Sequence, residues 1–162
     1  MALLVITAIL VALGLWLLSR PHAIPPPHVD SAGLRQFINI DIPITAVKWE
    51  IFKAPEDGFL PTPDPYTTLI AEIELSDPGW YQPQGMLTTR GQVRPESVRP
   101  WLSPLFKDLM HKATTDGHAL AAFKCEKLVT PIKSSGRVVQ GFMCASSGKV
   151  LLHLLVDGPP AS

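Results

Sequence analysis

The side chains best suited to catalysis lie close together in the chain, at His111, Asp116 and His118. An imidazole beside a carboxylate can act as an acid–base pair, and the same groups could bind a metal ion. They straddle the predicted end of a helix, however, and no further ligand follows at a spacing typical of zinc sites. We therefore expect no metal site and no cofactor. A small enzyme that uses these three residues is the alternative to a protein without catalytic activity.

The two cysteines, Cys125 and Cys144, are placed to pair across a hairpin. If the chain turns around Ser134-Ser135-Gly136, residues opposite one another have numbers that sum to about 270, and these two sum to 269. Opposed strand residues have Cα atoms ~4.5–5.5 Å apart, which a disulfide accepts. Disulfides persist in oxidising compartments, so the pairing favours a domain outside the cytoplasm. Two buried thiols are the alternative.

Two turn-rich segments, 54–65 and 76–95, carry apolar side chains that simple connections do not need. Proline-stiffened loops lose little entropy on binding, and Trp and Tyr are frequent interface anchors. The segments therefore predict a surface that binds another protein, unless Trp80 instead caps the core. The predicted binding residues are Asp57, Phe59, Leu60, Asp64, Trp80 and Tyr81.

The charges balance over the whole chain but not along it. Residues 50–77 carry seven acidic side chains against Lys53 alone, whereas residues 90–149 carry ten basic side chains against four acidic ones. Either the two halves neutralise one another after folding, or an acidic face attracts a basic partner. The basic residues do not alternate with exposed aromatic residues on one element, so nucleic-acid binding is not expected.

Two segments alternate with the period of a half-buried strand, from Ile44 to Lys53 and from Tyr66 to Leu75. In the first, Val47, Trp49 and Ile51 are expected to face the core and Lys48 and Glu50 the opposite side. In the second, the inward residues are Leu69, Ala71, Ile73 and Leu75, and the outward ones Thr68, Glu72 and Glu74.

Residues 95–113 change to helical spacing, with apolar side chains recurring every three or four positions. Ser103 is a good N-cap before Pro104, which predicts a short turn at about 96–102 and a main helix at about 104–113. Three strands follow, at about 119–130, 137–144 and 149–156, with Gly-containing turns between them. The fold class is α+β, with about five antiparallel strands and one main helix packed on the sheet.

The first nineteen residues contain no charged side chain before Arg20. About 20 apolar residues cross a bilayer as a helix, so residues 1–19 are predicted to be an uncleaved signal-anchor that contacts lipid through residues 2–19. A cleaved signal peptide is the alternative, although suitable small residues before a cut are missing. Arg20 favours a cytoplasmic domain, and the paired cysteines favour a periplasmic one. We follow the cysteines.

Residues 20–31 form a Pro-rich linker, and residues 32–162 are expected to form one extracytoplasmic domain. His22 and His28 in the linker are not expected to bind metal. The sequence thus predicts a single-pass protein of the inner membrane whose periplasmic domain binds another protein, one that the acidic stretch suggests is basic. An immunity-type inhibitor and an accessory subunit of an envelope complex both fit this description.

Overall fold

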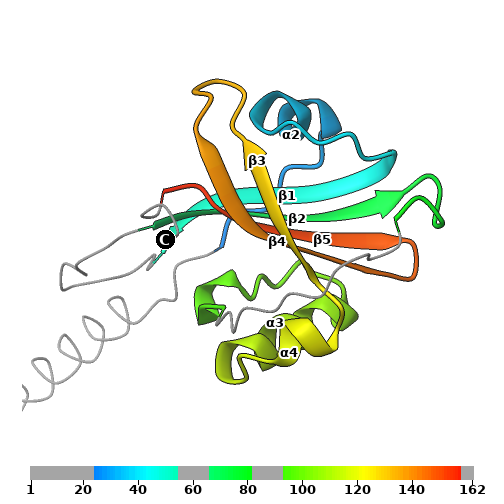
Figure 1. Cartoon of the computed structure of the whole chain (residues 1–162), viewed down its shortest axis with the longest axis vertical. Helices are drawn as coiled ribbons and strands as arrows, with labels where there is room; N and C mark the ends of the chain where they lie inside the picture. Colours follow the sequence, from blue (N-terminus) through cyan, green and yellow to red (C-terminus); the bar gives the residue numbers. More distant parts are fainter. Residues whose placement is uncertain (1–23, 55–65, 82–92, 158–162) are drawn as a thin grey trace, which may run out of the picture.

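The structure, a computed structural model, describes residues 24–54, 66–81 and 93–157 (Figure 1). The predicted anchor at 1–19 and most of both predicted binding loops therefore lie outside the described residues. Among those that are described, no helix is both long and apolar enough to span a membrane.

One five-stranded antiparallel sheet forms the centre of the domain. Its strands lie in the order β1-β2-β5-β4-β3, so β5, the last in the sequence, sits between β2 and β4. The chain crosses from β2 to the far edge of the sheet and returns as a meander. The strand bounds are β1 Ile44–Ala54, β2 Tyr66–Leu75, β3 Glu126–Pro131, β4 Val138–Ser146 and β5 Lys149–Leu155.

Both turns of the meander contain residues in the left-handed conformation. Ser147 and Gly148 have φ of 52° and 74°, as a two-residue type I′ turn requires. Gly136 has φ of 68°, and its N–H donates to the Ile132 carbonyl at 2.8 Å. The predicted turns are therefore confirmed, and the register that they set pairs Glu126 with Met143.

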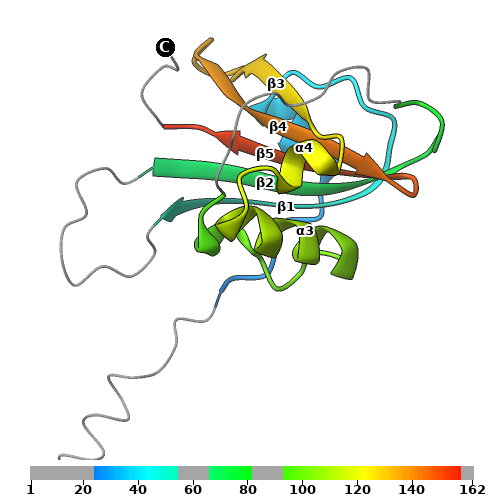
Figure 2. The same ribbon diagram turned by 60° about the horizontal axis from the view of Figure 1, so that its bottom comes forward.

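Helices cover both faces of the sheet (Figure 2). The face under α3 (Pro104–Thr115) and α4 (Ala119–Ala122) holds one apolar cluster, which includes Phe106, Leu120 and Phe142. The opposite face, under α2 (Ser31–Phe37), holds a second cluster around Leu34 and Leu69. The strands thus carry apolar side chains on both sides, because each side has a cover to pack against.

The helical predictions are partly confirmed. The main helix begins at Pro104 after Ser103 as predicted, although the Ser103 side chain makes no capping hydrogen bond. The 3₁₀-helix η1 (Pro95–Ser97) forms the short turn before it. The prediction of a strand from residue 119 is wrong, since 119–122 form α4 and β3 begins at Glu126. Helix α2 was not predicted; its N-cap Asp30 accepts a bond from the Gly33 N–H at 2.8 Å.

The expectation that the polar residues of β1 and β2 face outward is wrong for three of them. Glu50, Thr68 and Glu72 are buried on the face that α3 covers, whereas Lys48 and Glu74 are exposed as expected. Alternation of polar and apolar residues assigns side chains to two faces, but it does not say whether the polar face meets water.

The end of the predicted linker contacts β1. The backbones of His28 and Trp49 exchange two hydrogen bonds of 2.8 and 2.9 Å, and their rings lie 4.6 Å apart. The Trp49 indole N–H donates to the Asp30 carbonyl at 3.0 Å. These bonds attach residues 28–30 to the edge strand β1. They give hydrogen-bond partners to some of the backbone N–H and C=O groups that β1 directs away from β2.

Candidate functional site

A buried ion pair lies between the sheet and the segment that leads into α3. The Arg99 guanidinium contacts the Glu50 carboxylate at 2.7 Å, and their side chains are 1% and 6% exposed. The Trp101 indole N–H donates to the other Glu50 oxygen at 3.1 Å, and the Arg99 guanidinium lies 3.7 Å from the centre of the Phe52 ring. Because the pair is buried and the carboxylate is neutralised, it joins the segment before α3 to the sheet and is not placed to act on a substrate.

His153 is buried in the same layer. Its Nε2 lies 3.1 Å from the Ser97 hydroxyl, and its ring stacks on Phe142 at 4.8 Å. Burial lowers the pKa of His153 to about 4, because the low-dielectric interior disfavours the charged imidazolium. The side chain is therefore neutral at physiological pH, and the residue is only 6% exposed.

Glu72 ties β2 to the start of α3. Its carboxylate accepts a bond from the Ser103 backbone N–H at 2.7 Å and pairs with Lys149 at 3.2 Å. The Glu50–Arg99 and Glu72–Lys149 pairs each join an acid of residues 50–77 to a base of residues 90–149. To this extent the two oppositely charged halves neutralise one another, which was one of the two explanations left open by the sequence.

The three residues of the catalytic alternative lie at the end of α3. His111, Asp116 and His118 are all exposed, and the bond between the last two joins the Asp116 carboxylate to the His118 backbone N–H at 2.9 Å. That bond does not orient the imidazole. No group of three His, Cys, Asp or Glu side chains suited to a metal ion occurs among the described residues.

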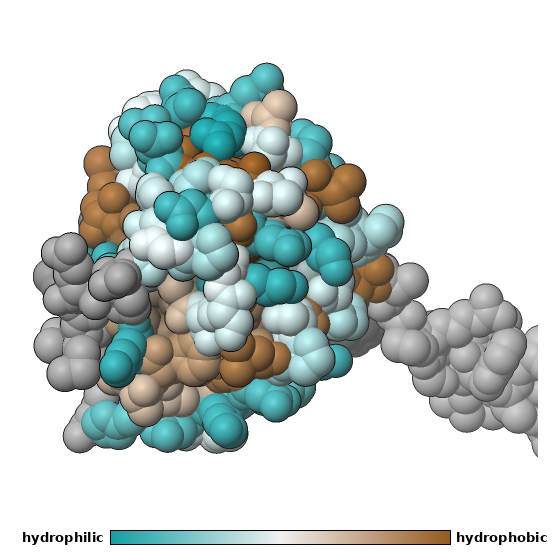
Figure 3. Space-filling model, turned by 90° about the vertical axis from the view of Figure 1, so that its right-hand side faces the viewer, coloured by the Kyte–Doolittle hydropathy of each residue, from teal (hydrophilic) through white to brown (hydrophobic). Residues whose placement is uncertain are grey.

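An open groove of about 350 Å³ lies between α3 and α4. Figure 3 shows apolar side chains gathered low on the molecule, level with these helices in Figure 1. Of the three candidate catalytic residues, Asp116 lines the groove and neither histidine does. The lining residues are Leu105, Asp108, Leu109, Lys112, Asp116, Ala119, Ala122 and Phe123.

Of the predicted binding residues, Trp80 and Tyr81 are described, whereas Asp57, Phe59, Leu60 and Asp64 lie outside the described residues. Trp80 is 41% exposed and closes a turn in which its N–H donates to the Asp77 carbonyl at 3.1 Å. It is therefore available to a partner. Tyr81 is half-buried and packs against the α2-side cluster, so its ring belongs largely to the core.

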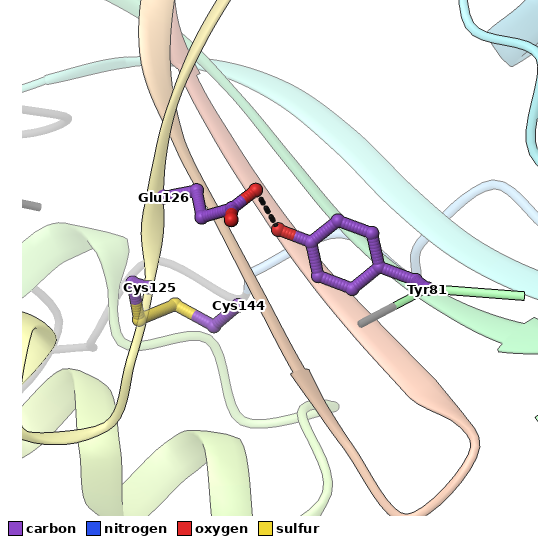
Figure 4. Close-up of a disulfide and its surroundings, with 4 residues drawn as sticks. All are labelled: Tyr81, Cys125, Glu126 and Cys144. Atoms are coloured by element: carbon purple, nitrogen blue, oxygen red, sulfur yellow. Dashed lines mark hydrogen bonds between the residues drawn. A yellow bond between two sulfur atoms is a disulfide. The ribbon is translucent and has the colours of Figure 1, made fainter. Parts of the chain in front are cut away.

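Tyr81 also holds the start of β3 (Figure 4). Its hydroxyl donates to the Glu126 carboxylate, and burial together with this bond raises the pKa of Tyr81. Cys125, the residue before Glu126, points to the other face of the sheet. There it forms a disulfide with Cys144, with a Cα–Cα distance of 4.2 Å. The predicted pairing of the two cysteines is confirmed.

The face of the sheet toward α3 is left open at one corner. In one register row Phe52 and Thr68 are buried, but Leu155 and Val129 are 38% and 54% exposed. Gln140 on β4 lies between Val129 and Leu155 in this row. Val138, two residues earlier on β4 and on the same face, is 65% exposed. In Figure 1 the hairpin of β3 and β4 runs upward, away from α3 and α4. We call Val129, Val138 and Leu155 the open sheet surface.

Comparison of the chain with protein-family models, curated proteins and solved structures found no match.

The sequence prediction missed the open sheet surface. The signal for it was present in the pairs Leu128-Val129, Val138-Val139 and Leu154-Leu155. Neighbouring apolar residues on a strand point to opposite faces, so each such pair requires a cover on both sides of the sheet. The helices supply that cover on one side only at this corner.

Proposed function

We propose that this protein is a binding domain without catalytic activity, attached to the inner membrane by residues 1–19 and exposed to the periplasm. The observation that carries the proposal is the open sheet surface, where three large aliphatic side chains on adjacent strands are exposed. Exposed apolar side chains grouped on one face of a folded domain can mark a site where another molecule binds, and here the three surround the polar Gln140. Trp80, exposed at the opposite end of β2, offers a second anchor.

The periplasmic location rests on the disulfide, which is stable in an oxidising compartment. An immunity-type inhibitor or an accessory subunit of an envelope complex would use such a domain. A basic partner remains compatible with the acids of residues 50–77, although Glu50 and Glu72 are already paired within the domain and contribute less to an outer field.

Membrane attachment is tested on protein from its native membrane. The mature protein should keep Met1 and should resist extraction from the membrane by alkaline carbonate. An N-terminal sequence that begins near Ala23 or Ile24 would instead show that a signal peptide had been removed.

The binding function is tested by chemical cross-linking in membranes, followed by capture of the full chain and mass spectrometry. Val138→Lys or Leu155→Lys should remove a captured protein, because a charge is placed in the apolar contact. Trp80→Ala should weaken capture by about 1–2 kcal/mol if the indole is an anchor. Thr115→Lys, at an exposed site on α3, is the matched control and should capture normally. Equal capture by all four variants would contradict the proposal.

A further inference from the structure

Among the described residues, none donates or accepts a backbone hydrogen bond at the outer edge of β3 beside the open sheet surface, at Lys127 and Val129. The Ile132 N–H donates to the Arg137 carbonyl at 2.8 Å, and hydrogen-bonded pairs alternate along an antiparallel ladder. Thr130 and Leu128 are therefore the next residues that bond to β4, in the register that the strands adopt. It follows that Lys127 and Val129 direct their N–H and C=O groups away from β4.

Part of this edge is already covered by the chain itself. Ile38 forms a bridge with Ile132, and the Lys133 N–H donates to the Phe37 carbonyl at 3.0 Å. Within the described part of the chain, no backbone hydrogen bond reaches Lys127 or Val129 from outside the sheet. The covered end shows that the edge accepts an extended segment, and the open end continues in line with it.

The charge around the open edge is positive. Lys127 lies on the same face as Val129 and is exposed. The turn between β3 and β4 carries Lys133 and Arg137, and Lys124 lies two residues before β3. Arg137 pairs with Asp157 at 3.0 Å, but both side chains are about half exposed. The acid of the hairpin, Glu126, already accepts the Tyr81 hydroxyl. An incoming segment with carboxylates would thus meet complementary charge.

We propose that the edge of β3 at Lys127–Val129 pairs with an extended, acidic segment of a partner protein, which adds a strand to the sheet. This inference rests on the proposed binding function and names the chemistry of the one segment that pairs with β3; the basic character considered above concerns the partner as a whole. The added strand satisfies the outward backbone groups, places a β-branched or apolar side chain beside Val129 on β3, and sets carboxylates near Lys127. An anionic bilayer could meet the lysines, but it offers no ordered backbone to pair with the edge.

The test uses the full chain in detergent micelles and a fluorescein-labelled peptide of alternating valine and glutamate. The peptide should bind, and hydrogen exchange at the Lys127 and Val129 amides should slow when it does. Val129→Pro removes the outward N–H without touching a bond to β4, and edge strands tolerate proline. It should weaken binding at least about tenfold, whereas the matched Val129→Ala, which keeps the N–H, should weaken it less.

Lys127→Glu should weaken binding of the valine–glutamate peptide by about fivefold and should strengthen binding of a valine–lysine peptide. Protection that appears at α3 and α4, or equal binding by the proline and alanine variants, would overturn strand pairing. A different outcome would assign the surface to lipid: the full chain binds phosphatidylglycerol vesicles but not the peptide, and Lys127→Glu abolishes the binding to vesicles. If cross-linking to a partner still depends on Val138 and Leu155 while the peptide does not bind, the proposal of an added strand is wrong and the proposed binding function stands.

Discussion

Arg99 and Glu50 are 49 positions apart in the chain, yet their side chains meet at 2.7 Å inside the domain. The contact joins the strand β1 to the segment between η1 and α3, so it fixes that segment against the sheet. A buried charge is tolerated only when a partner neutralises it. Each residue of this pair therefore depends on the other.

Removal of either charge alone should destabilise the domain strongly. Arg99→Met leaves the Glu50 carboxylate buried without its cation, and Glu50→Gln leaves the guanidinium without its anion. Each should lower the free energy of unfolding by about 3–5 kcal/mol, measured by urea denaturation of the full chain in detergent. The double variant should lose less free energy of unfolding than the sum of the losses of the two single variants. Strict additivity would show that the pair contributes no coupling energy.

The stability of the domain should depend on His153 between pH 4 and 6.5. The folded-state pKa is about 4 and the usual value is 6.5, so in this window the unfolded chain binds the extra proton. Stability is fully present above pH 6.5 and falls by roughly 3 kcal/mol as the pH drops toward 4. Unfolding curves of the native chain and of His153→Gln should therefore converge in acid. His111→Gln, at an exposed site, is the control and should keep the native pH dependence.

Reduction of the disulfide should destabilise the domain. Without reductant the intact mass should be two hydrogens lower, and a thiol reagent should label neither Cys125 nor Cys144. The chain-entropy model assigns about 3 kcal/mol to a loop of this size, and the hairpin that already closes the loop makes the measured loss smaller. Free thiols in protein taken from its native compartment would contradict the pairing. They would also remove the main argument for a periplasmic domain.

Lys124 is a position where glycine should be more stable than the native residue. Its φ of 63° places it in the left-handed region, just after Phe123, the C-cap of α4. Here the Cys125 N–H donates to the Leu120 carbonyl at 2.9 Å. Glycine adopts this helix-terminating conformation without the steric cost that a side chain incurs. Lys124→Gly should raise the free energy of unfolding by up to about 1 kcal/mol. Lys112→Gly within α3 should lower the free energy of unfolding by a similar amount. If both variants were less stable than the native chain, glycine would not be favoured at position 124.

The sequence alone determined the features that depend on neighbours along the chain. The spacing of apolar residues after Ser103-Pro104 predicted α3, because helical periodicity is a local property. The Gly-containing turns predicted the register of β3 and β4, and from that register the pairing of Cys125 with Cys144 followed. A hairpin turn fixes which residues face one another without reference to the rest of the fold.

Tertiary structure decided the features that depend on what covers a strand. Nothing near Glu50 in the chain indicates that Arg99 will neutralise it, so its alternation with Val47 and Trp49 pointed to solvent when the side chain is in fact buried. The insertion of β5 between β2 and β4 is likewise a choice among distant pairings. The exposure of Val129, Val138 and Leu155 has the same origin, because it follows from where α3 and α4 stop covering the sheet. Burial is set by the packing of whole layers, which no local pattern encodes.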